Sequence, residues 1–304
     1  MAPGSILRVF TDVMLPVLLV AAVGGLAGRR LGLQLETLQR ATFYLFSPAL
    51  VFDGLANVHL QRGALARLVA VSVTVFVLNA AIGVIWARIR RVPATSAAAI
   101  AIGSAVPNQG NMGLPMALLA FGPAGLELAT VLFVIGVVLN SSAAVTLGTF
   151  SLGGHARRDV LLAPLRFPAI YAAAAGISAN LLDLRLPAAA TESVATLAQA
   201  SIPVMLVILG LSFHTPRLDR LVDPLAVSVN RLVVGPLLAW AGAAVIGLSG
   251  LGSHVAIMMA GMPVAVNTTI LAGQLRADAE LATQAVIVST MCSIVTLSVL
   301  ISVL

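Results

Sequence analysis

The chain has 304 residues, of which 60% are hydrophobic and only 9% are charged, and its mean hydropathy is +1.06. Soluble domains carry roughly 25% charged residues, so this chain has too few polar side chains to cover a globule in water. Since only helices and closed barrels span lipid, the apolar stretches predict an all-α polytopic membrane protein. The net charge of +6 comes from arginines in short loops, which favours orientation in a membrane over nucleic acid as a partner.

Ten apolar stretches follow one another, each close to the length of about 20 residues that a helix needs to cross the hydrocarbon core. They cover residues 9–28, 41–58, 65–87, 96–121, 125–150, 160–182, 190–213, 222–248, 253–275 and 279–303. The first is kept as a span because its flanks do not resemble a cleavable signal sequence. The connections are short and leave no soluble domain. We therefore expect ten transmembrane helices.

The arginines are divided unevenly between the two sides of these spans. The loops after spans one, three, five, seven and nine, with the adjoining helix ends, hold 13 of the 17 arginines, and the other side holds 4. By the positive-inside rule the arginine-rich side faces the cytoplasm. We expect a protein of the cytoplasmic (inner) membrane with both termini outside.

The fourth stretch is interrupted by the sequence PNQGNMGLP at residues 107–115. A proline removes a backbone hydrogen bond, and a broken helix survives in lipid only where protein or a polar cavity covers it. The expected helix-breaking residues here are Pro107, Gly110 and Pro115. The amides of Asn108, Gln109 and Asn111, with the freed backbone N–H groups, suit a carboxylate or similar anion. The alternative is that the amides only repair the broken backbone, but three amides exceed what repair needs.

The ninth stretch carries a matching interruption, MPVAVNTT at residues 262–269. Pro263 is the expected break, and Asn267 and Thr268 are the expected binding residues, although threonines also bond their own helix carbonyls. Two broken helices at corresponding places in two halves are the best sequence indication of a secondary transporter's binding site.

The two halves show traces of an internal repeat. Five spans in each half give the halves opposite orientations, and ELAT follows the first break at 127–130 and the second at 280–283. We interpret residues 1–150 and 160–304 as inverted five-helix repeats, with broken helices four and nine crossing near the midplane.

Other polar residues within the spans have competing interpretations. Asp53 is a candidate for proton or cation coupling, because an acid in lipid is costly and usually functional; alternatively it is hydrated at the outer interface. We expect Arg231 to reach the cytoplasmic surface, with attraction of an anionic substrate as the alternative. We expect Asn140 to hold helices together, with a place in the cavity wall as the alternative. No catalytic residues, metal ligands or cofactor motifs emerge, so an enzyme is not expected.

Three segments resemble the auxin efflux carrier family: PNQGNMGLP at 107–115, MPVAVN at 262–267 and SPALVF at 47–52. The resemblance implies ten helices in two inverted repeats, a fold shared with sodium–bile acid symporters and sodium–proton antiporters. Spans one, two, six and seven would form a scaffold, often homodimeric, and spans three to five and eight to ten a transport domain. It implies organic anions as substrates: auxin in plants, dicarboxylates such as malonate or malate in bacteria. The short middle connection favours a bacterial-type member.

The predicted function is therefore a secondary carrier that moves a small organic anion by alternating access at the crossing of helices four and nine. Besides the substrate and membrane lipid, a proton or sodium ion is the candidate partner. The alternatives are a sodium- or proton-coupled symporter or antiporter of the same fold, and a membrane sensor that binds its ligand without moving it.

Overall fold

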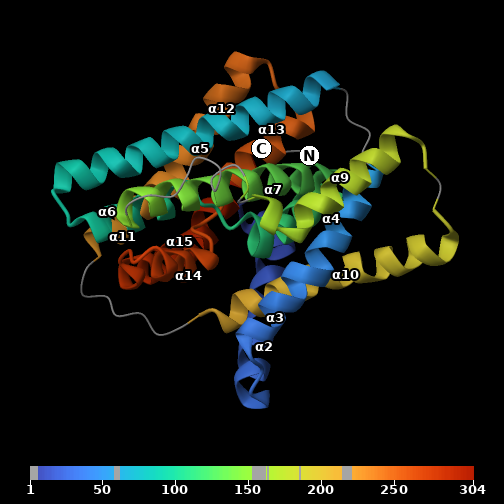
Figure 1. The fold of residues 1–304 in the computed structure, drawn as a ribbon, viewed down its shortest axis with the longest axis horizontal. Helices are drawn as coiled ribbons and strands as arrows, with labels where there is room; N and C mark the ends of the chain where they lie inside the picture. The colour runs from blue at the N-terminus through green and yellow to red at the C-terminus, as the bar shows by residue number, and fades with distance from the viewer. Residues whose placement is uncertain (1–5, 58–61, 153–161, 163, 185, 214–220) are drawn as a thin grey trace.

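The computed structural model describes residues 6–57, 62–152, 162, 164–184, 186–213 and 221–304. Within these ranges the secondary structure is helical apart from one isolated bridge between Pro107 and Val264. The helices cross the molecule in several directions around a central pair of interrupted ones (Figure 1). The expectation of an all-α protein is confirmed for the described residues.

The first half contains ten helical segments, some of them continuous with the next. They are α1 (Ile6–Val9), η1 (Phe10–Met14), α2 (Leu15–Leu31), α3 (Leu35–Ala41), η2 (Thr42–Phe46), α4 (Ser47–Ala56), α5 (Arg62–Arg90), α6 (Ala94–Ala105), η3 (Gln109–Gly113) and α7 (Leu114–Leu152). Gly122 interrupts α7 with φ 70° and ψ −165°, a conformation that suits glycine, and so divides it near the expected boundary between spans four and five.

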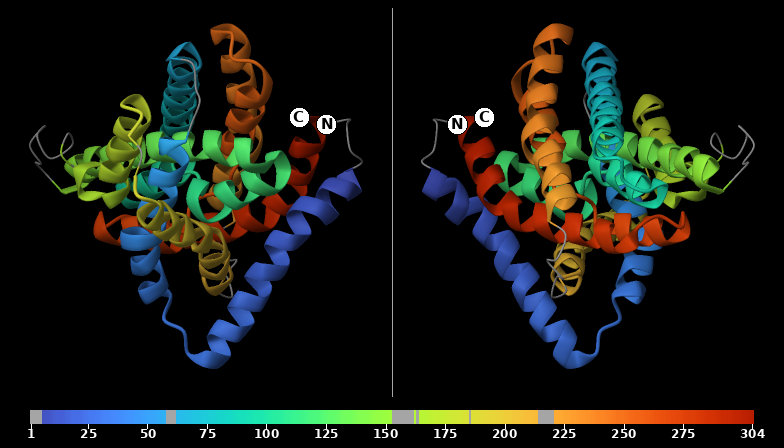
Figure 2. Two further views of the ribbon diagram at one scale, coloured as in Figure 1. Left: turned by 90° about the vertical axis from the view of Figure 1, so that its right-hand side faces the viewer. Right: turned by 90° about the vertical axis from the view of Figure 1, so that its left-hand side faces the viewer.

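The second half contains nine segments within the described residues. They are η4 (Pro164–Arg166), α9 (Pro168–Leu181), α10 (Ala188–Leu211), α11 (Val222–Val229), η5 (Asn230–Val234), α12 (Gly235–Ile246), α13 (Gly250–Ala260), α14 (Asn267–Gln274) and α15 (Ala279–Val303). The two views of Figure 2 show α2 leaving the body of the molecule as one arm of a V, with α3 and α4 returning as the other.

Six of the described helices are long and apolar enough to cross a membrane, and two shorter ones are also apolar. The long ones are Ile6–Leu31, Gly63–Arg90, Gln109–Ser142, Ala188–Leu211, Val222–Ile246 and Ala279–Val303; the shorter are Ala94–Ala105 and Gly250–Ala260. These helices agree with a multi-pass membrane protein, and the count of ten spans stays a prediction.

Four π-helical turns have a common cause in proline. The segments η1, η2, η3 and η5 each end two residues before a proline, at Pro16, Pro48, Pro115 and Pro236. Because proline has no N–H to continue the ladder, one wider turn absorbs the missing hydrogen bond and the helix goes on. Pro115, expected among the helix-breaking residues, therefore widens a helix and does not end it.

A glycine-lined contact joins α2 to α10. A Cβ placed on Gly210 would lie 1.8 Å from the Ala21 carbonyl oxygen, and one on Gly25 would lie 2.7 Å from the Gly210 oxygen. In lipid, small residues of this kind let two backbones approach until dispersion forces hold them. Helix α4 packs on α9 by the same means, since a Cβ on Gly176 would lie 2.8 Å from the Phe52 oxygen.

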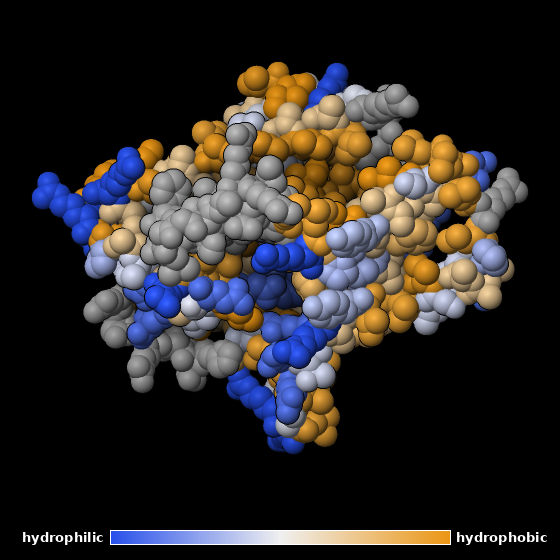
Figure 3. All heavy atoms as spheres, in the orientation of Figure 1, coloured by the Kyte–Doolittle hydropathy of each residue, from blue (hydrophilic) through white to orange (hydrophobic). Residues whose placement is uncertain are grey.

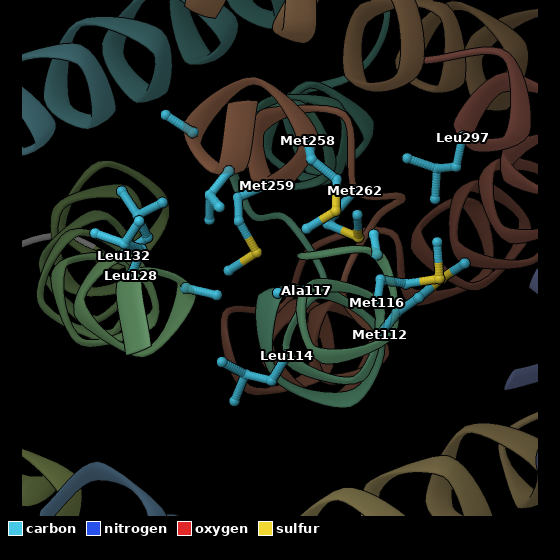
Figure 4. Close-up of a cluster of buried hydrophobic side chains, with 14 of the residues drawn as sticks. Met112, Leu114, Met116, Ala117, Leu128, Leu132, Met258, Met259, Met262 and Leu297 are labelled. Carbon is cyan, nitrogen blue, oxygen red and sulfur yellow. The ribbon is translucent and has the colours of Figure 1, made fainter. Parts of the chain in front are cut away.

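Methionines and leucines form the packed core between α7 and α13. Met112, Met116, Met258, Met259 and Met262 are all at most 1% exposed, and they lie between the ribbons of the two interrupted spans (Figure 4). Unbranched methionine fills irregular gaps, which suits helices that break where they meet.

Candidate functional site

Each interrupted span is divided into two helices by a short non-helical segment. The first span leaves α6 at Ala105 and becomes helical again at Gln109; the second leaves α13 at Ala260 and resumes at Asn267. Pro107 and Pro263 lie inside these segments. We refer to residues 106–108 and 261–266 together as the crossover.

Two backbone hydrogen bonds join the segments of the crossover. The Asn108 N–H donates to the Pro263 oxygen at 2.8 Å, and the Ala265 N–H donates to the Val106 oxygen at 3.1 Å, as in an antiparallel bridge. A third donor, the Val264 N–H, bonds Ser289 Oγ at 3.0 Å. The backbone groups that the breaks expose therefore find partners in the opposite segment or in α15.

The side-chain amides beside the crossover do not take part in this repair. Asn108 is 3% exposed, yet its Nδ2 has no hydrogen-bond partner, and neither has the buried Oε1 of Gln109. Buried polar atoms in native proteins are almost always paired, so such atoms need an explanation. Because these atoms have no hydrogen-bond partner, ligand binding is favoured over backbone repair as the role of these amides.

An open cavity of about 750 Å³ lies beside these amides. All five expected binding residues line it: Asn108, Gln109, Asn111, Asn267 and Thr268, together with Pro107 and Gly110. A space-filling view shows polar residues around a hollow near the middle of one face, with apolar residues flanking it (Figure 3). The structure thus brings together residues that lie more than 150 positions apart in the sequence.

Polar residues from other helices complete the cavity wall. The buried Gln39 Nε2, Thr42 Oγ1, Asn140 Oδ1 and Thr268 Oγ1 also lack partners, and all four residues line the cavity. Sequence reasoning favoured a helix-packing role for Asn140 and passed over the other two new residues. Asn140 carried a signal, its depth within a span, whereas Gln39 and Thr42 lie near a loop and resemble solvated residues.

One side of the cavity is aromatic. Phe43 contacts Tyr44 and Phe167 edge to face, with ring centroids 4.9 and 5.3 Å apart, and all three residues line the cavity. Such rings give the cavity an apolar surface in addition to its amides. A ligand with one polar end and one apolar face would match both.

Charge is scarce along the cavity. Among the described lining residues only Glu36 and Arg40 are charged, and they pair with each other at 2.7 Å between Oε1 and Nη2. Both side chains are more than 70% exposed, so this pair lies in solvent and contributes little stability. Deeper recognition of a ligand falls to neutral amides and hydroxyls.

Asp53, the candidate coupling residue, is half-buried and does not line this cavity. It lies on α4, where its carbonyl oxygen accepts a hydrogen bond from Asn57 Nδ2 at 2.8 Å. In this conformation the structure does not bring Asp53 together with the amides of the crossover.

Arg231 departs from one of its two expected placements. It lies in η5 and is only 1% exposed, so its side chain does not reach the membrane surface. It lines a small cavity of about 40 Å³ that shares Pro107, Gln109 and Asn140 with the large one. The sequence could show the depth of Arg231 in its span but not the partners that hold it there.

Gly136 on α7 makes room for the Gln109 amide, and this predicts a change in ligand binding. A Cβ on Gly136 would lie 1.9 Å from Gln109 Oε1, so Gly136→Ala should displace the amide. We expect ligand affinity to fall about tenfold, the value of one hydrogen bond to a charged group, with little change in melting temperature because a side-chain end can move. Gly273→Ala is the matched control, since nothing lies within 4 Å of its Cβ. Titration calorimetry of both variants measures this; wild-type affinity in Gly136→Ala would remove Gln109 from the site.

Long apolar helices around a cavity with unpaired polar groups are typical of a polytopic membrane protein. The comparisons with known proteins agree. A family model described as "Membrane transport protein" matches residues 9–156 and 155–301, and the chain belongs to this family, the auxin efflux carrier family.

Two relatives show the same similarity along most of their length. An "Uncharacterized transporter" of Methanothermobacter thermautotrophicus is 28% identical over 297 residues, which is 94% of this chain and 96% of that protein. A "Putative malonate transporter" of Rhizobium meliloti is 25% identical over 264 residues, 84% of this chain and 82% of that protein. The family and its named members are membrane transporters, which confirms transport as the class of function.

Proposed function

We propose that this protein is a secondary carrier that moves a small organic anion, a carboxylate, by alternating access at the crossover. The observation that carries the proposal is the set of buried polar groups without partners beside the crossover. The Asn108 amide and the Thr268 hydroxyl are donors that a carboxylate oxygen would accept from. The similarity to a protein named for malonate, a dicarboxylate, supports the same class of substrate.

The packing of the helices supports a division into scaffold and transport domain. Helix α10 packs on α2 and α4, and α4 packs on α9, so the helices of spans one, two, six and seven contact one another. The crossover helix α6 packs on α5 and α15 instead. In the proposed mechanism two inverted repeats, residues 1–150 and 160–304, each supply part of both domains, and the scaffold also forms a homodimer.

The position of the cavity mouth supports an inward-facing conformation. Glu36 and Arg40 line the cavity from the connection after span one, and Gln274 lines it from the end of span nine, both on the arginine-rich side. By the positive-inside rule that side faces the cytoplasm, so in the proposed orientation in the inner membrane the cavity opens to the cytoplasm.

The membrane potential is a sufficient driving force for export. A monoanion that leaves a negative-inside cell gains about 2.3 kcal/mol per 100 mV. Uptake would need a coupled cation, and Asp53 would have to reach the substrate's path in another conformation to serve as its site. Export on the potential is therefore the simpler mechanism for this site.

The first experiment is thermal stabilisation of the purified protein across malonate, malate, succinate, acetate and neutral analogues of similar size. A ligand at a hundredfold excess over its dissociation constant adds about 2.7 kcal/mol to the free energy of unfolding. We expect a carboxylate to raise the melting temperature of the wild type but not of an Asn108→Ala/Asn111→Ala variant. Stabilisation by the neutral analogues alone would contradict an anion carrier. Counterflow of the bound carboxylate in liposomes then separates a carrier from a sensor, which would bind it without flux.

A further inference from the structure

Arg231 is a buried cation without an acidic partner. It is the largest side chain among the fully buried residues, and within the described ranges no carboxylate lies within 4 Å of its guanidinium. Placing an unpaired charge in a membrane interior is costly, and charges found there are usually functional. Something other than an ion pair must therefore compensate it.

The compensation comes from backbone carbonyls at the ends of both interrupted helices. Arg231 Nη2 donates to the Ala260 oxygen at 2.8 Å, and both Nε and Nη2 donate to the Met262 oxygen at 3.3 Å. Nη1 donates to the Ser104 oxygen at 3.4 Å. One planar guanidinium thus joins the carboxyl end of α6 to that of α13, a geometry for which its fork of donors is suited.

These carbonyls are free because the helices break. In a continuous helix the Ser104 oxygen would accept from the Asn108 N–H, but that N–H bonds Pro263. The Ala260 oxygen would accept from the Val264 N–H, which bonds Ser289 Oγ instead. Unsatisfied carbonyls give the carboxyl end of a helix a partial negative charge. Two such ends meeting in lipid require a cation.

We propose that Arg231 is a positioning residue that supplies the fixed cation of the crossover, an inference that rests on the carrier function proposed above. In carriers with broken helices, carbonyls of this kind coordinate the coupling ion. Here the guanidinium of Arg231 donates hydrogen bonds to those oxygens in place of an ion. Substrate binding therefore does not depend on an inorganic cation. Arg231 also borders the small cavity beside Gln109, where its charge favours an anion.

The first test measures malonate affinity of the wild-type protein in sodium, potassium and N-methylglucamine buffers of equal ionic strength. We expect the same dissociation constant in all three. Malonate binding that requires sodium or potassium would overturn the proposal, and this arm needs no variant. If malonate and the other carboxylates do not bind in any buffer, the carrier function has failed, and the variants below still test the cation role.

The second test compares Arg231→Ala, Arg231→Lys and the exposed control Arg88→Ala. We expect Arg231→Ala to weaken malonate binding about 100-fold, the loss that a misplacement of about 1 Å can cause. Arg231→Lys should retain part of the affinity, and low-millimolar guanidinium should restore Arg231→Ala by occupying the vacated carbonyls. Guanidinium should likewise raise the melting temperature of Arg231→Ala alone, a readout that needs no substrate.

Wild-type affinity of Arg231→Ala in N-methylglucamine buffer would show that the crossover needs no cation. Loss of binding in both Arg231→Ala and Arg231→Lys, with no response of either to guanidinium or sodium, would show a packing role only and overturn the inference. If Arg231→Ala does not fold, partial binding by Arg231→Lys and the buffer series decide the question.

Discussion

An Asn108→Ala variant is expected to lose transport while its folded state remains at least as stable as that of the wild type in the absence of substrate. Asn108 is buried with a free Nδ2, and an unpaired buried amide costs about 1–3 kcal/mol of stability. Removing it relieves that cost. The bound substrate loses a hydrogen bond to a charged group, worth about 1.5–3 kcal/mol, or roughly 10- to 150-fold in affinity.

The prediction is specific because the substitution should lower substrate affinity without lowering the stability of the folded state. A structural asparagine would lose stability on truncation, whereas a binding asparagine kept at the expense of stability would not. Melting temperature without ligand and counterflow of malonate in liposomes are measured on the same preparations. Asn57→Ala is the control, because Asn57 is exposed and does not line the cavity. Wild-type flux in Asn108→Ala, or a melting temperature below that of the wild type, would contradict a binding role for this amide.

The sequence indicates the crossover because proline chemistry is local. Pro107 and Pro263 each remove a backbone N–H and crowd the preceding turn through their own rings, and the neighbouring amides stand out in apolar stretches. The same local argument fails for Pro115, since a proline near the beginning of a helix needs only one wider turn. Helix breaks can thus be located from the sequence, but whether each proline breaks or widens its helix depends on the partners around it.

The remaining parts of the site depend on contacts between distant segments. Gln39 and Thr42 lie near a loop in the sequence, and only the packing of α3 and η2 on α10 puts them on the same cavity as the crossover residues. The carbonyl oxygens that accept hydrogen bonds from Arg231 are available only because two helices break at the same point. The sequence around residue 231 therefore cannot predict them. Hydropathy gives the depth of a residue, not the direction in which it faces.

The close approach of α2 and α10 leads to the prediction with the largest effect on stability. A Cβ on Gly210 would lie 1.8 Å from the Ala21 oxygen and 2.9 Å from the Gly25 nitrogen, and backbone atoms cannot turn aside as a side chain can. The helices must separate and lose their contact along several turns. Overpacking of this kind costs about 1–3 kcal/mol and sometimes more, so Gly210→Ala should melt at a lower temperature and Gly210→Leu should fail to give folded protein.

Gly242→Ala on α12 is the matched control, because its nearest contact would be Val71 Cγ1 at an ordinary 3.9 Å. Removing a mid-helix glycine there should leave the melting temperature unchanged or slightly higher. If α2 and α10 belong to a scaffold that moves as one body, the Gly210→Ala protein that does fold should bind malonate with wild-type affinity, since the amides of the crossover are undisturbed. A melting temperature equal to that of Gly242→Ala would show that this contact opens freely, and α2 and α10 would then belong to different moving parts of the carrier.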